Sequence, residues 1–376
     1  MGWHPPLPTY TDDAGIAWHV HRAWHDKKPS DYVLEVLAPG QPGVRGAQIS
    51  HGRFRLLPDD DPELPALRAE REHGEVIAYR PYMRAIIRAD GRYIKVFQPG
   101  SADVPAERCA QMDLLLDAGA FTAPAILHHS PDTLVFRALP GPTLREIGEN
   151  HSTVDEKAFA ATWTAWSRAW VAQLTAASDA TRRKVLSTLP VHSPEEEVAV
   201  VARWLKRWLH HAERVPALAS QREALRASAD RIITNLLQAA PDPMVWNHGD
   251  LHDMQVIVRD GGPPFGLLDF DDAAQGEAAR DLANLDVHLE LRLRQSTLTP
   301  ERYAVAHTAV MRAAEQLQVS QGRFDAYSDA SWIRLACSSL PARSTLATGV
   351  LEERAQRPQP FGSSNLTGSQ PAGFWS

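Results

Sequence analysis

The hydrophobic pattern of the chain changes near its middle. Before about residue 140, apolar residues come in short β-prone runs that glycine, proline and aspartate interrupt, as in Tyr32–Leu37 and Tyr93–Phe97. From about residue 155 they recur instead at positions i, i+3 and i+4, the spacing of amphipathic helices. This change predicts an α+β fold with a small β-rich N-terminal part and a larger, mostly helical C-terminal part.

Turn and helix-start residues locate several elements of the N-terminal part. The runs 83–88 and 93–97 flank Asp90-Gly91, which predicts a β-hairpin. The apolar spacing over 105–118 predicts a helix that begins at a proline. A further strand is predicted over 132–137, and the Pro/Gly-rich residues that follow predict an irregular connection.

Three long helices are predicted in the C-terminal part, over 155–177, 194–212 and 218–238. Aromatic residues at helical spacing lie more often in a core than on a carbohydrate-binding surface, because they bury a large apolar area. We therefore expect the tryptophans of these helices to form the core of this part: Trp163, Trp166, Trp170, Trp204 and Trp208.

The composition excludes several classes of protein. Of the 376 residues, 44% are hydrophobic and 23% charged, as in an ordinary globular protein that is long enough for two lobes. A net charge of -7 argues against a nucleic-acid partner that needs a basic face. No apolar run has the length of a membrane span, and the first residues lack the pattern of a signal peptide. We expect a cytoplasmic enzyme with neither a membrane nor a nucleic-acid partner, and the sequence leaves its oligomeric state open.

The most informative residues follow the third long helix. His248-Gly249-Asp250 is followed five positions later by Gln255, and Asp269 ends the second of two short predicted strands, 256–258 and 265–268. A hairpin of these strands would bring Gln255 and Asp269 to the same end of the ribbon. Phosphoryl transfer needs an aspartate that orients and deprotonates the acceptor hydroxyl, and oxygen ligands that hold Mg²⁺. Asp250 suits the first role, and Gln255 with Asp269 suits the second.

At these residues the chain resembles the aminoglycoside phosphotransferase and choline kinase family, which is similar to protein kinases. The family pattern H-G-D-x-x-x-x-N, D-x-D and D-L-A has its counterparts in His248–Gln255, Asp269–Asp271 and Asp281–Ala283. The resemblance is best over 77–290. It implies a bilobal protein-kinase-like fold, ATP and Mg²⁺ as cofactors, and transfer to a hydroxyl of a sugar, an amino sugar or an aminoglycoside.

The resemblance also implies a role for each matching residue. Lys95 of the hairpin would bind the nucleotide phosphates, and Glu107 on the next helix would hold Lys95. Asp281 would support the catalytic loop by accepting hydrogen bonds, and His248 would be structural. Asp271 would join the metal ligands or face the substrate. The backbone of residues 137–139 would meet the adenine, whereas the substrate residues are expected among the C-terminal helices, with Asp325, Trp332 and Arg334 as candidates.

Two departures from the family pattern leave alternatives open. Gln255 stands where the family usually has asparagine, which resembles the maltokinase and glucosamine kinase branch and points to a sugar or amino sugar. A glycine-rich phosphate loop is not evident before the hairpin. One alternative is a catalytically weak pseudokinase that binds nucleotide and regulates a partner. A metal-dependent hydrolase that uses His248, Asp250, His252 and Asp269 is another, but it would leave Lys95 unexplained.

These elements predict four regions. Residues 1–76 would form an N-terminal cap or additional N-lobe strands, and 77–140 the nucleotide-binding N-lobe. Residues 141–354 would form the helical C-lobe with the catalytic loop. The remainder, 355–376, is rich in Pro, Gly, Ser and Gln and is expected to be disordered.

Overall fold

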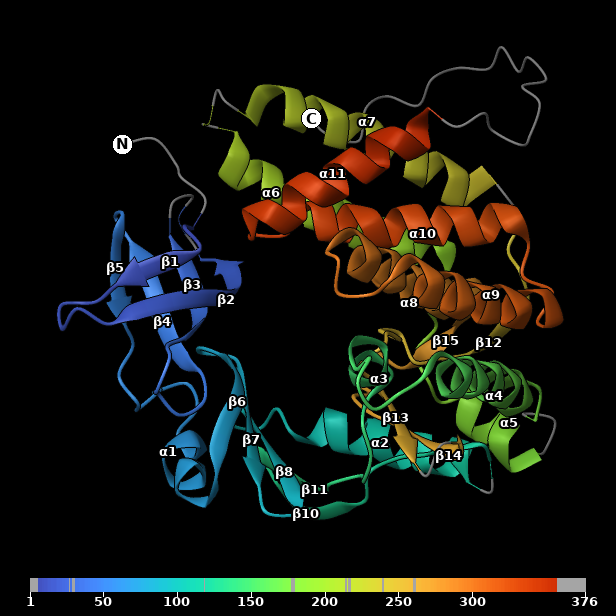
Figure 1. Ribbon diagram of the computed structural model, residues 1–376, viewed down its shortest axis with the longest axis horizontal. Coiled ribbons are helices and arrows are strands. Elements are labelled where there is room, and N and C mark those ends of the chain that lie inside the picture. The colour runs from blue at the N-terminus through green and yellow to red at the C-terminus, as the bar shows by residue number, and fades with distance from the viewer. Residues whose placement is uncertain are drawn as a thin grey trace.

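The computed structural model has the expected α+β architecture, with sheets in the N-terminal half and helices in the C-terminal half (Figure 1). It describes residues 6–356 except 27, 29–30, 118, 177–179, 214, 216–217, 239 and 260–261. From residue 357 on, the predicted disordered tail lies outside the described residues.

The first 56 residues contain a separate antiparallel sheet with the strand order β1-β2-β3-β4-β5. Its strands are β1 (Thr9–Thr11), β2 (Ala17–His25), β3 (Tyr32–Leu37), β4 (Arg45–Ser50) and β5 (Arg53–Leu56). Strand β3 is buried over most of its length, and Trp18, Tyr32 and Leu34 belong to a small core of this sheet. The sheet thus has apolar residues of its own to bury, as a folded unit requires.

A second five-stranded sheet, with the order β10-β11-β8-β7-β6, forms the N-lobe. Its strands are β6 (Glu75–Arg80), β7 (Arg84–Ala89), β8 (Arg92–Phe97), β10 (Ile126–Ser130) and β11 (Thr133–Arg137). The hairpin of β7 and β8 turns at Gly91, as predicted, where φ is +63°. Helix α2 (Asp103–Leu116) follows β8 and turns Met112 and Leu115 into the main core.

Hydrogen bonds fasten the first sheet to the second. The buried carboxylate of Glu35 accepts a hydrogen bond of 2.6 Å from the Tyr79 N–H of β6.

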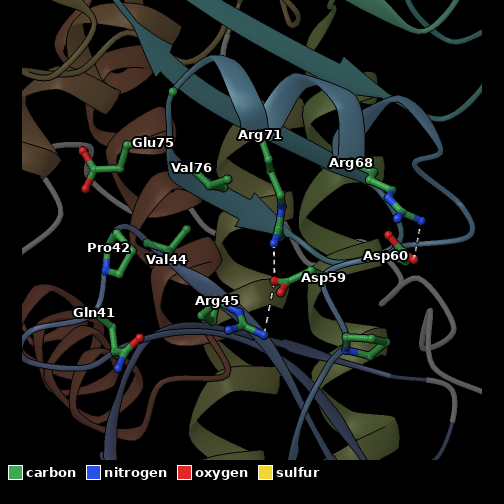
Figure 2. A pocket seen from close by; sticks show the side chains of 12 residues that line it. Gln41, Pro42, Val44, Arg45, Asp59, Asp60, Arg68, Arg71, Glu75 and Val76 are labelled. Carbon is green, nitrogen blue, oxygen red and sulfur yellow. Dashed lines mark hydrogen bonds and ion pairs between the residues drawn. The ribbon is translucent and has the colours of Figure 1, made fainter.

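A pocket of about 530 Å³ lies next to the short helices α1 (Ala66–Glu70) and η1 (Arg71–His73) (Figure 2). Its aspartates are paired with arginines: Asp59 with Arg45 and Arg71, and Asp60 with Arg68. The charges of the pocket are therefore largely balanced within it.

The C-lobe is mostly helical. Its helices are α3 (Leu144–Glu149), α4 (Glu156–Thr175), α5 (Ala180–Leu186), α6 (Pro194–Ala212), α7 (Ala219–Gln238), α8 (Ala278–Arg294), α9 (Pro300–Gln316), α10 (Gln321–Ala336) and α11 (Pro341–Ala355). Two small sheets complete it, one of β12 (Met244–Asn247) and β15 (Ala274–Glu277), the other of β13 (Val256–Arg259), β14 (Gly262–Leu267) and β9 (Phe121–Thr122).

The three long predicted helices are present as α4, α6 and α7, and most of their tryptophans lie in the core. Trp163, Trp166, Trp170 and Trp208 are buried, but Trp204 is 37% exposed, so the expectation for this residue was wrong. Trp204 and Trp208 both lie on α6, but the buried stripe of this helix passes through Val201, Leu205 and Trp208 and leaves Trp204 beside it.

The first sheet also reaches the C-lobe. The imidazole ring of His25 on β2 stacks on that of His211 on α6, with ring centroids 3.8 Å apart and planes 7° apart. Among the described residues, no helix is long and apolar enough to cross a membrane.

Candidate active site

Helix α8 holds the backbone of the predicted catalytic loop. The loop begins after β12, and Asp281 on α8 accepts hydrogen bonds from the N–H groups of His248 (2.6 Å) and Gly249 (2.9 Å). Gly249 has φ of +89°, and a Cβ atom there would lie 2.0 Å from the Asp272 carbonyl oxygen. Only glycine fits this turn. The contacts of Asp281 are those expected of a residue that supports the loop.

His248 joins the catalytic loop to the end of β14. Its Nε2 lies 2.6 Å from the carbonyl oxygen of Leu268, which can only accept, so Nε2 must donate. Its Nδ1 then accepts from the N–H of Asp250 at 3.3 Å. With both ring nitrogens in use, His248 is not placed to bind a metal ion, which argues against the hydrolase alternative.

The carboxylate of Asp250 stands at the open side of the loop, 52% exposed. Asn284 on α8 donates to it from Nδ2 at 3.4 Å and also binds the Leu251 carbonyl oxygen at 3.0 Å. Asn284 thereby orients Asp250. The sequence analysis missed Asn284, although its position three residues after Asp281 puts both on one face of α8.

The backbones of the two candidate metal ligands lie close together, whereas the side-chain nitrogen of Gln255 lies 3.4 Å from His252 Nε2. The Leu268 N–H donates to the Gln255 carbonyl oxygen at 2.9 Å, so Asp269 directly follows the residue paired with Gln255. Asp269 has φ of +62°, in the left-handed region that aspartate tolerates better than most residues. Carboxylate and amide oxygens are hard ligands that suit Mg²⁺, and Asp269 already binds one cation, the Lys95 ammonium group. The side-chain oxygens that these two residues offer are therefore of the type that a magnesium ion prefers.

Lys95 bridges the two lobes at this point. Its Nζ is 2.7 Å from Asp269 Oδ1 and 3.6 Å from Asp271 Oδ1, and only 15% of its side chain is exposed. Burial alone would lower the pKa of Lys95, but the two carboxylates raise it above its usual value. Burial would raise the pKa of Asp269, yet Lys95 holds it below its usual range. Arg84 Nη1 adds a second cation, 3.0 Å from Asp271.

The expected partner of Lys95 on α2 is not in place. Glu107 is exposed, and among the ion pairs of the described residues those of Lys95 are with Asp269 and Asp271. The buried face of α2 carries Cys109, two positions and about 200° around the helix from Glu107. Burial raises the pKa of Cys109 to about 11, so its neutral thiol supplies no counter-charge.

The turn between β6 and β7 occupies the place of a phosphate loop but contains no glycine. Tyr82 has φ of +66°, and its N–H donates to the buried carboxylate of Asp61 at 2.8 Å. The Met83 N–H donates to the Arg80 carbonyl oxygen at 3.1 Å. Both N–H groups are therefore engaged within the protein and do not point to a phosphate. The first cationic side chain after the turn is that of Arg84.

Part of the connection expected to meet adenine is used within the protein. The N–H groups of Arg137 and Ala138 donate to the carbonyl oxygens of Ala125 and Gly91, so the contact with adenine stays a prediction for the other backbone groups of residues 137–139.

Two candidate substrate residues lie apart from the predicted catalytic loop. The candidate substrate residue Trp332 is fully buried. Asp325 accepts a hydrogen bond of 3.1 Å from Gln321, one turn earlier on α10.

Arg334, in contrast, reaches the site. Its Nη2 donates to Asn284 Oδ1 at 3.2 Å, and Asn284 in turn donates to Asp250. Asp253 of the catalytic loop is buried, and its oxygens accept from Arg292 at 3.1 and 3.4 Å. The side chain of Asp253 therefore serves an internal ion pair.

Comparisons with known proteins found a matching family model and solved structures with a similar fold. The sequence model of a phosphotransferase enzyme family matches residues 51–293. The comparison with curated proteins found no match.

Solved structures with a similar chain path include the streptomycin–ATP ternary complex of APH(2″)-IIa, with 15% identity, 76% of this chain and 94% of that chain covered, and a TM-score of 0.49. A thermostable mutant of aminoglycoside phosphotransferase APH(4)-Ia, with ADP and hygromycin B, has 14% identity, 87% and 95% coverage, and a TM-score of 0.49. Macrolide 2′-phosphotransferase MphH from Brachybacterium faecium has 20% identity, 73% and 89% coverage, and a TM-score of 0.40.

Proposed function

Since the chain belongs to the phosphotransferase enzyme family, we propose that it transfers the γ-phosphoryl group of ATP to a hydroxyl group of a small molecule. The observation that carries this proposal is the ion pair of Lys95 with Asp269, 2.7 Å long, which joins the N-lobe sheet to the residues after β14. Around it lie the parts that phosphoryl transfer needs, namely cations for phosphate, oxygen ligands for a metal ion and an exposed carboxylate.

Asp250 is the proposed catalytic base. Its carboxylate accepts the proton of the acceptor hydroxyl while the hydroxyl oxygen bonds to the γ-phosphorus atom. The bond from that phosphorus to the bridging oxygen breaks, and ADP leaves with the electron pair. Asn284 holds the carboxylate in position, and Asp281 holds the loop that carries it.

Two cations and two ligands would hold the nucleotide. Lys95 and Arg84 are proposed to bind phosphate oxygens, with Asp271 between them as the carboxylate that positions both. Gln255 and Asp269 would hold Mg²⁺, which supplies neutralisation of charge on the phosphates. Glu107 is not part of this set, because it faces solvent.

The decisive test is ADP release by the variant Asp250→Asn, with the exposed hairpin residue Asp90→Asn as its matched control. Loss of the base should lower kcat by about 10²–10⁴-fold, whereas the control should behave like the wild type. The pseudokinase alternative rests on Gln255, which departs from the usual metal-ligating asparagine. It predicts that MgATP binds, as measured by calorimetry, but that no acceptor raises ADP release in either protein.

A further inference from the structure

The side-chain amide of Asn284 is held at both of its ends. Its Nδ2 donates to Asp250 Oδ1 at 3.4 Å and to the Leu251 carbonyl oxygen at 3.0 Å, and its Oδ1 accepts from Arg334 Nη2 at 3.2 Å. Because a guanidinium group can only donate, it must face the amide oxygen, and the amide nitrogen must then face the catalytic loop. Arg334 therefore decides which end of the amide meets the carboxylate of Asp250.

The guanidinium group of Arg334 is itself fixed at both Nη atoms. Nη2 donates to Ser331 Oγ at 2.8 Å as well as to Asn284, so both of its hydrogens are used within the protein. Nη1 lies 3.8 Å from Oε1 of Glu197. A substrate contact through Nη2, the nitrogen nearest to the catalytic loop in this network, would have to replace one of these hydrogen bonds.

Glu197 supplies the negative charge opposite Arg334. It is fully buried, and its Oε2 accepts a hydrogen bond of 2.7 Å from Nε2 of His192. Burial would raise the pKa of Glu197, but Arg334 and His192 lower it to about 2, so the carboxylate is charged at neutral pH. A charge in such a place needs a partner, because an unpaired buried ion is costly. The ion pair with Glu197 therefore keeps the guanidinium group beside α6.

This network joins three helices of the C-lobe to the catalytic loop. Glu197 lies on α6, Asn284 on α8 and Arg334 on α10, and α10 packs against both of the other helices (Figure 1). Their packing thus sets the position of an amide that touches Asp250. A misplacement of about 1 Å in a catalytic group can lower a reaction rate about 10²-fold.

On the basis of the proposed function, we propose that Arg334 is a positioning residue, anchored by Glu197, which orients Asp250 through the amide of Asn284. Without Arg334 the amide is free to turn its oxygen toward Asp250, and two acceptors would then face each other. The carboxylate would lose its donor and its alignment with the acceptor hydroxyl. Since Arg334 does not touch substrate in this scheme, its loss should lower kcat and leave KM nearly unchanged.

The first test is ADP release by the full-length variant Arg334→Met. The assay contains MgATP with glucosamine, maltose or streptomycin, and a parallel sample without any of them. We expect kcat to fall about 10–100-fold while the KM for ATP and for the acceptor changes by less than about twofold. Arg312→Met, at an exposed site on α9, removes the same charge and should behave like the wild type. A raised KM for the acceptor with kcat unchanged would make Arg334 a substrate contact and overturn the inference.

A double-mutant cycle tests whether Arg334 acts through Asn284. The variant with both Arg334→Met and Asn284→Ala should be no slower than Asn284→Ala alone, within about twofold, because the amide that Arg334 orients is already gone. Losses that multiply would overturn the inference.

A purely structural ion pair is the other role to separate. Arg334→Met leaves Glu197 without this partner, so urea denaturation is run on each variant, and the pair Arg334→Met with Glu197→Gln removes both charges at once. This pair should show the same loss of kcat as Arg334→Met. A lower urea midpoint with kcat unchanged would reduce the contact to a structural one and refute the proposal.

The orientation of the amide can be measured without catalysis. In the ¹⁵N-labelled, nucleotide-free protein, the side-chain amide signals of Asn284 are identified by their absence from Asn284→Ala. They should shift or broaden in Arg334→Met and stay in place in Arg312→Met. Unchanged signals in Arg334→Met would overturn the inference and leave the kinase standing. If no sample of the wild type releases ADP but these signals depend on Arg334, the proposed function fails and the orientation of the amide by Arg334 stands.

Discussion

The ion pair between Lys95 and Asp269 allows the sharpest test of the site, because it can be broken from either side. The variant Lys95→Met removes the ammonium group and leaves Asp269 without an ion pair among the described residues, whereas Asp271 keeps Arg84 at 3.0 Å. Breaking a buried pair costs about 3–5 kcal/mol, and an exposed pair contributes about 0–1 kcal/mol. With exposed fractions of 15% for Lys95 and 29% for Asp269, we expect a cost of about 2 kcal/mol.

The assay is urea denaturation of the nucleotide-free protein near pH 7, applied as a double-mutant cycle with Lys95→Met, Asp269→Asn and both together. A coupling energy of about 2 kcal/mol is expected, since the double variant removes both charges. The pKa of Asp269 is lowered in the folded state, so its contribution is present above the usual carboxylate range and is lost as the pH falls through that range and below.

A matched control comes from the same sheet. Arg88 on β7 pairs with Glu75, and both side chains are exposed, so Arg88→Gln should cost no more than about 1 kcal/mol. A coupling energy between Lys95 and Asp269 no larger than the cost of Arg88→Gln would refute the reasoning, because burial would then not strengthen the interaction.

The remaining predictions concern other parts of the fold. Asp281→Asn turns one acceptor into a donor facing a backbone N–H of the catalytic loop, which costs about 1–3 kcal/mol; steady-state kinetics should show kcat reduced about 10–100-fold with the KM for ATP little changed. Glu277→Gln leaves the guanidinium of Arg323 uncompensated where both side chains are 0% exposed, so denaturation should report a loss of about 3–5 kcal/mol. Burial and basic neighbours lower the pKa of His25 to about 3, so the folded state binds fewer protons than the unfolded state. Stability should fall by about 2 kcal/mol between pH 7 and pH 5, and His25→Phe should remove that part of the pH dependence.

Much of the fold followed from local pattern. Strand β3, the hairpin at Gly91 and the helices α4, α6 and α7 were all predictable, because turn residues and apolar spacing act over a few neighbouring positions. The order of the catalytic residues was equally visible, since Asp250, Gln255 and Asp269 lie on two loops separated by a short hairpin.

Contacts between distant segments could not be read in the same way. The sequence placed Glu107 and Cys109 on one helix, but only packing decided that Cys109 faces Lys95 while Glu107 faces solvent. These residues lie about 200° apart around the helix, so the rotation of the helix about its own axis decides which of them is buried. The sequence alone does not set that rotation. Likewise, Asp61 became the carboxylate that holds the β6–β7 turn only because the segment between β5 and α1 folds against that turn.

The sequence by itself determined the kind of elements in this protein, their order and the catalytic motif, because these depend on residues close together in the chain. The tertiary structure decided the counter-ions of Lys95 and the support of Asp250 by Asn284. These are questions of charge and distance between segments as far apart as 174 residues for Lys95 and Asp269. Such distances depend on how whole helices and sheets pack, and no local pattern in the chain specifies them.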